Sequence, residues 1–136
     1  MKIRVATPIR PTEAPERVRQ AILNLFPDAN LEASADRIAG SVVDLQAFRR
    51  RIWELRIIDS ARGQILHGLT PDLATIRFRL SKQAALANQV AFPPRPHILG
   101  DIEVIVEAEA NDTLTPEQWA WWLCPETQDG EIVGPM

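Results

Sequence analysis

Residues 101–109 read DIEVIVEAE, and this stretch decides the fold class. Apolar and mostly acidic residues alternate along it, with Ile102, Val104 and Val106 on the apolar side. A period of two is typical of a β-strand that has one buried and one solvated face. Such strands indicate an antiparallel or mixed sheet, because parallel sheets are usually covered on both faces. We therefore expect helices to cover only one face of the sheet.

Two further stretches, residues 2–9 and 74–80, alternate in the same way. Their solvated sides carry four cations, Lys2, Arg4, Arg77 and Arg79. If these strands neighbour residues 101–109, cross-strand charge pairs should form over the solvated face. That face lacks the exposed aromatic residues on which sheet-type RNA readers stack bases. We expect it to be structural or covered by a second subunit.

Apolar residues at helical spacing predict helices between these strands. One begins with Pro15 in its first position and ends at Pro27-Asp28. Residues 45–62 form a second helical region, with Asp44 as its N-cap and a phase shift near Arg56 that predicts a bend or two helices.

Shorter elements complete the predicted order. Residues 31–38 indicate a hairpin, residues 82–87 a helical turn capped by Ser81, and residues 90–92 a short strand. A last helix follows Thr115 as N-cap and Pro116. The sequence predicts an α+β two-layer sandwich, with a single domain over residues 1–124 and a polar, frayed tail over 125–136.

Charge is distributed unevenly along the 136 residues. All fifteen Lys and Arg lie at or before Arg95, and nine of the eighteen acids follow residue 100, so 15 − 9 gives +6 before that point and −9 after it. Either the two parts neutralise one another in the fold, or the basic part faces a nucleic acid. A single cysteine allows no intrachain disulfide, and no apolar run is long enough for a signal peptide or a membrane span, so we expect a cytoplasmic protein.

Three stretches carry a resemblance to a known family: TPIRPTEAPERVRQAILNLFPDA (7–29), RIIDSARGQIL (56–66) and LSKQAAL followed by VAF (80–92). Over residues 3–123 the chain resembles an uncharacterised archaeal family of the UPF type. The resemblance implies the fold of the ribosomal protein that binds 5S rRNA. It also implies kinship with proteins that are predicted to bind RNA or to associate with the exosome.

The candidate RNA-binding residues lie mainly in the second helical region: Arg49, Arg50, Trp53, Arg56 and Arg62. Arg49, Trp53 and Arg56 would share one helical stripe, where arginines bind phosphates and the indole stacks on an unpaired base. The simpler interpretation is that Asp59 pairs with Arg56 or Arg62 and that Trp53 is partly core.

Lys82 is a further candidate phosphate ligand, because it opens a helical turn and has no acid nearby in the sequence. Gln83 more simply satisfies loop backbone groups. In the last helix, Trp119 and Trp122 should pin the helix to the core, whereas Trp121 could mark a protein interface.

Enzyme motifs are missing from the sequence. His67 and His97 form no cluster at metal-ligand spacing, and Cys124 is expected to be an ordinary thiol. We therefore expect a non-catalytic, RNA-associated protein without cofactor or metal. The alternatives are a protein-interaction or homodimeric module and, third, a small-molecule enzyme.

Overall fold

The computed structural model describes residues 1–128 and 131–132, and its main feature is a five-stranded sheet in the order β2-β3-β1-β5-β4. Every neighbouring pair of strands is antiparallel. The strands are β1 (Lys2–Pro8), β2 (Asn30–Ala33), β3 (Arg37–Val42), β4 (Thr75–Leu80) and β5 (Ile102–Glu107). The predicted α+β class is confirmed, and so is the hairpin, which β2 and β3 form.

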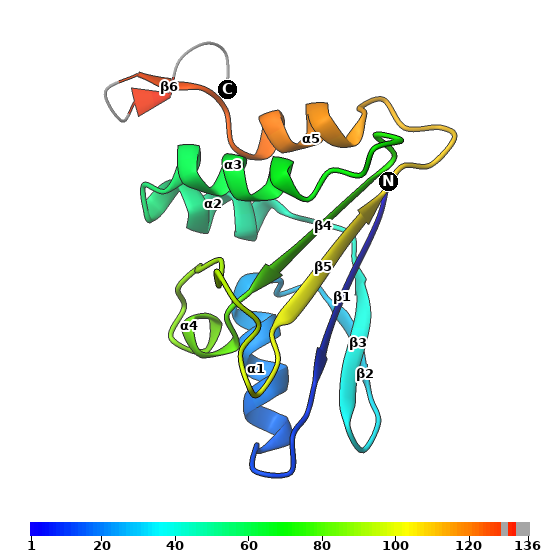
Figure 1. Cartoon of the computed structure of the whole chain (residues 1–136), viewed down its shortest axis with the longest axis vertical. Helices are drawn as coiled ribbons and strands as arrows, with labels where there is room; N and C mark the ends of the chain where they lie inside the picture. The colour runs from blue at the N-terminus through cyan, green and yellow to red at the C-terminus, as the bar shows by residue number, and fades with distance from the viewer. Residues whose placement is uncertain (129–130, 133–136) are drawn as a thin grey trace.

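Five helices accompany the sheet. They are α1 (Pro15–Leu25), α2 (Gln46–Glu54), α3 (Ile58–His67), α4 (Lys82–Leu86) and α5 (Pro116–Leu123). In Figure 1, α2, α3 and α5 lie at the upper end of the sheet, whereas α1 and α4 lie beside its lower half. Phe48 of α2 links the two groups, because its ring lies 4.9 Å from that of Phe26 after α1 and 6.3 Å from that of Phe78 on β4.

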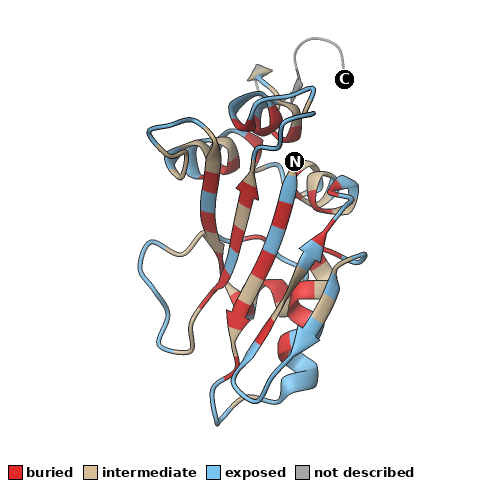
Figure 2. Cartoon of the chain, turned by 90° about the vertical axis from the view of Figure 1, so that its right-hand side faces the viewer, coloured by how far each residue is buried: buried red, intermediate tan, exposed pale blue. Residues whose placement is uncertain are grey.

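The predicted alternation fixes the register of the central strands. Ile3 and Val5 of β1 lie opposite Val106 and Val104 of β5, and all four side chains are buried. Figure 2 shows buried and exposed residues alternating along the strands. Helices therefore pack against the apolar face, and the polar side chains point to the other face.

Charge pairs cross the polar face, as predicted. Arg4 pairs with Glu107, Arg77 Nη1 lies 3.6 Å from Glu103 Oε1, and Arg79 Nη1 lies 3.1 Å from Asp101 Oδ2. Pairs of this kind that are exposed contribute under about 1 kcal/mol each. Their role is to set the register and the solubility of the face more than its stability.

The second helical region forms two helices, because the chain turns sharply at Arg56. Arg56 has a φ of 58°, a left-handed conformation that no α-helix can continue through. The predicted cap at Asp44 is wrong by one residue: Leu45 is the N-cap, although Asp44 Oδ1 accepts the Gln46 N–H at 2.8 Å. By contrast, Ser81 caps α4 and Thr115 caps α5, as expected.

The segment over residues 90–92 is not a strand, contrary to the prediction. Val90 is buried, but it is held by a loop in which the Ser81 N–H donates to the Ala91 carbonyl at 2.9 Å. The apolar residues of this segment therefore indicated that it is buried, but not that it pairs with the sheet.

Past α5, strands β6 (Thr127–Gln128) and β7 (Glu131–Ile132) pair antiparallel. The rest of the segment predicted to fray, residues 129–130 and 133–136, lies outside the described residues, and the boundary at residue 124 stays a prediction. Among the described residues, no helix is both long and apolar enough to cross a membrane.

Candidate functional site

The C-terminal end of α5 is fastened by side chains from α2 and α3. The last carbonyls of a helix have no partner within the helix and need outside donors. Arg49 Nε donates to the Trp122 carbonyl at 3.1 Å, and Trp53 Nε1 donates to the Leu123 carbonyl at 2.9 Å. Three of the predicted RNA-binding residues, Arg49, Trp53 and Arg62, therefore hold α5 in place.

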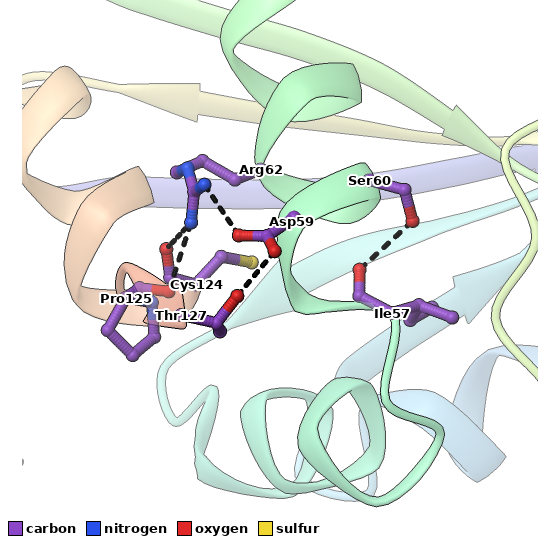
Figure 3. A network of polar contacts seen from close by, with 7 residues as sticks. All are labelled: Ile57, Asp59, Ser60, Arg62, Cys124, Pro125 and Thr127. Carbon is purple, nitrogen blue, oxygen red and sulfur yellow. Dashed lines mark hydrogen bonds and ion pairs between the residues drawn. The ribbon is translucent and has the colours of Figure 1, made fainter. Parts of the chain in front are cut away.

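Arg62 makes the third of these attachments. Its Nη1 donates to the carbonyls of Cys124 and Pro125, both at 3.0 Å, and its Nη2 lies 2.7 Å from Asp59 Oδ1. Thr127 donates its hydroxyl to the other oxygen of Asp59. Figure 3 shows this network joining the start of α3 to the segment after α5. The hydroxyl of Thr127, and then Arg62, lower the pKa of the Asp59 carboxyl below its ordinary value.

The same arginines stack on indoles. The Arg49 guanidinium carbon lies 4.1 Å from the Trp53 ring centroid and 4.5 Å from that of Trp122. The Arg62 guanidinium lies 4.4 Å from the Trp121 centroid. Burial lowers the pKa of Arg49, but an arginine stays charged at neutral pH. Arg49 is thus a cation held between two aromatic planes.

Trp53 lines two hollows. One, of about 410 Å³, is bordered by Arg49, Arg50 and Glu54. The other, of about 290 Å³, is bordered by Arg56 and Asp59. The predicted stripe of Arg49, Trp53 and Arg56 is wrong as a helix face, because α2 ends at Glu54. The turn at Arg56 nevertheless returns its side chain to the neighbourhood of Trp53.

Arg50 and Arg56 are the exposed candidates on this surface. Within the described part of the chain, neither side chain makes a hydrogen bond or an ion pair, whereas Arg51 pairs with Glu54 at 3.3 Å. The sequence predicts phosphate binding by Arg49, Arg50, Arg56 and Arg62 alike. The structure separates them into those that fasten α5 and those that face solvent.

Lys82 lies elsewhere, at the start of α4, and only 7% of its side chain is exposed. Its Nζ donates to Glu13 Oε1 at 2.9 Å, to the Pro8 carbonyl at 2.9 Å and to the Leu99 carbonyl at 2.6 Å. The expectation that it lacks an acid partner is wrong, because the loop before α1 brings Glu13 to it. All three donors of the ammonium are occupied, so none is left for a phosphate.

The remaining titratable groups that the structure describes include two histidines and one cysteine. The described residues contain no group of three His, Cys, Asp or Glu side chains that could hold a metal ion. His97 Nδ1 accepts the Leu99 N–H at 3.0 Å, which orders its own loop. Burial raises the pKa of the Cys124 thiol to about 12, so it carries no thiolate at neutral pH.

Comparison with known proteins extends the description. A family model described as RNA binding matches residues 2–108, which include the whole sheet and α1–α4 but not α5. A UPF0201 protein of Methanothermobacter thermautotrophicus is 36% identical over 138 residues, covering 97% of each chain. A UPF0200/UPF0201 protein of Archaeoglobus fulgidus is 33% identical over 134 residues, and this chain spans 40% of its length.

Solved structures agree with these sequence matches. The crystal structure of a UPF0201 protein from Methanococcus jannaschii superposes with a TM-score of 0.87 at 27% identity, covering 98% of this chain and all of that one. A second crystal structure, of an uncharacterised UPF0201 protein, gives a TM-score of 0.84 at 30% identity. The resemblance to an uncharacterised archaeal family of the UPF type is confirmed: the chain belongs to the archaeal UPF0201 family, and most of it matches the family model described as RNA binding.

Proposed function

We propose that the protein binds single-stranded RNA without catalysing a reaction on it, through the α2 surface around Trp53. The observation that carries the proposal is the position of Arg50 and Arg56, two exposed arginines that pair with no described residue and that border the two hollows lined by the half-buried Trp53. The match to a family described as RNA binding supports the class of partner, and its range includes α2.

The charges on this surface favour a polyanion. Glu54 is paired with Arg51, and Asp59 is paired with Arg62, so the two acids beside the hollows are already neutralised. The remaining positive charge belongs to Arg49, Arg50 and Arg56. Arginines bind phosphate oxygens through a planar fork of donors, and an indole edge or face accepts an unpaired base. Backbone phosphates at Arg50 and Arg56 would place a nucleotide over Trp53.

A second candidate is association with another copy of the chain through the polar face of the sheet. Small side chains at Ala6, Ala39 and Ser41 leave a hollow of about 430 Å³ there, bordered by both cations and acids. A surface of mixed charge suits a like partner better than RNA. Light scattering over a range of protein concentrations reports on this candidate directly.

The RNA proposal is tested with a labelled single-stranded oligoribonucleotide and fluorescence anisotropy. We expect Arg50→Gln/Arg56→Gln to weaken binding and to reduce the slope of log K against log salt by about 1.4, the contribution of two phosphate contacts to a single strand. Arg17→Gln/Arg19→Gln, which removes two exposed arginines of α1, is the matched control. Equal loss in both double variants, or no binding by the parent protein, would refute the proposal.

A further inference from the structure

Helix α5 presents one indole to solvent. Trp119 is buried and Trp122 is half-buried beside Arg49, but 42% of Trp121 is exposed. Exposing so much of a large aromatic side chain forgoes hydrophobic stabilisation that burial would give. Core packing therefore does not explain the orientation of Trp121. An exposed indole in this position is available to bind a ligand.

One face of the Trp121 ring packs against a guanidinium that is itself held in place. The Arg62 guanidinium that lies 4.4 Å from the Trp121 centroid is held by two backbone carbonyls and by Asp59, and its side chain is only 15% exposed. Because these hydrogen bonds hold the guanidinium in one orientation, the Trp121 ring packs against a rigid plane. Little conformational entropy then remains to be lost when a flat ligand covers the indole.

The Trp121 ring packs against an arginine that is paired with Asp59. Among the exposed large apolar side chains that the structure describes, Trp121 is the aromatic one, and an arginine lies against its ring. A protein-docking patch would require contiguous apolar surface, whereas an indole resting on a guanidinium is the arrangement that stacks a nucleobase. Asp59 borders the same hollow as Arg56 and is bonded to Arg62, so Trp121 is linked to the proposed RNA surface through this ion pair.

We propose that Trp121 stacks on an unpaired base of the bound RNA, so that α5, outside the matched family region, supplies a base platform. This inference rests on the proposed function. Phosphates bound at Arg50 and Arg56 would supply affinity for any RNA strand. The Trp121 ring would add affinity for strands that carry strongly stacking purines, relative to strands without bases.

The test compares labelled oligoadenylate, oligouridylate and an oligomer of the same length with abasic positions. Trp121→Ala should weaken oligoadenylate binding at least about fivefold, in keeping with the loss of one base–aromatic stack, and should change abasic binding less than twofold. Trp121→Phe should keep most of the affinity. Leu114→Ala, at another exposed apolar residue in the segment before α5, is the matched control, and thermal unfolding checks that each variant is folded.

The outcomes separate the two proposals. If Arg50→Gln/Arg56→Gln weakens binding while Trp121→Ala does not, base stacking at Trp121 is overturned and RNA binding stands. An unchanged RNA affinity together with a change in oligomeric state would assign Trp121 to a protein contact and likewise overturn the inference. If the parent protein binds none of the oligomers, both proposals fall.

Discussion

Lys82 Nζ lies 2.9 Å from Glu13 Oε1, although 69 residues of chain separate them, and both side chains are largely removed from solvent. The pair joins two of the three stretches by which the chain resembles its family. It also ties the end of β1 to the loop before β5, since Lys82 donates to the carbonyls of Pro8 and Leu99.

Replacing Lys82 with Met should therefore be costly. The change leaves the Glu13 carboxylate and two carbonyls without their donor, and breaking a buried pair costs about 3–5 kcal/mol. Urea unfolding measures the loss. Because Lys82→Met/Glu13→Leu leaves no unpaired charge, it should lose less than the sum of the two single variants, and a simple sum would contradict a coupled pair.

Trp53→Phe should destabilise the protein by about 1 kcal/mol, because a ring remains but the Leu123 carbonyl loses its hydrogen bond. Trp121→Phe is the comparison, since the described contacts give its ring nitrogen no acceptor. Its unfolding free energy should stay within about 0.5 kcal/mol of the parent. Equal effects at the two positions would argue against the fastening role of Trp53.

Replacing Gly63 and Gly68 with alanine should change the stability of the protein in opposite directions. A methyl group at Gly63 meets nothing within 4 Å, so Gly63→Ala should stabilise the helix by about 0.5–1 kcal/mol. At Gly68, a Cβ would lie 1.8 Å from the Arg77 carbonyl oxygen, so Gly68→Ala must displace the edge of β4. Thermal unfolding of the pair tests this contrast, and a stable Gly68→Ala variant would contradict it.

Asp59 should contribute to the stability of the protein in neutral solution but not in strongly acidic solution. Its pKa in the folded protein lies below the ordinary value of 3.8, so its contribution is present above that pH and is lost as the pH falls through the lower folded value. The stability difference between the parent and Asp59→Asn should therefore shrink as the pH drops below about 4. A difference that does not change with pH would mean that charge plays no part.

Cys124 should resist alkylation in the folded protein. Its thiol is buried and has its pKa raised to about 12, so iodoacetamide at pH 8.5 should modify it only after unfolding. Because the unfolded chain ionises this thiol near its ordinary value of 9.0, stability should decline from that pH upward. Cys124→Ala, which removes the titrating group, should flatten this alkaline decline, and rapid labelling of the native protein would contradict the expected burial.

Features that depend on neighbouring residues in the sequence could be predicted, whereas contacts between residues far apart along the chain could not. Alternation and helical spacing are local, so the strands at 2–8, 75–80 and 102–107 and the break near Arg56 were visible in the sequence. The acid partner of Lys82 and the carbonyl acceptors of Arg49 and Arg62 lie between 62 and 73 residues away along the chain. Neither periodicity nor charge composition carries that information, which explains why the three fastening residues, Arg49, Trp53 and Arg62, were predicted to bind RNA.

The way in which α5 is attached also sets the size of the cooperative folding unit. The match to the family model ends at residue 108, yet Trp119, Ala120 and Leu123 belong to the buried core, and α2 and α3 direct three donors at carbonyls beyond that residue. A fragment cut at the family boundary would expose that apolar surface and leave those donors in water. The segment that the family model matches is therefore smaller than the segment that must fold as one.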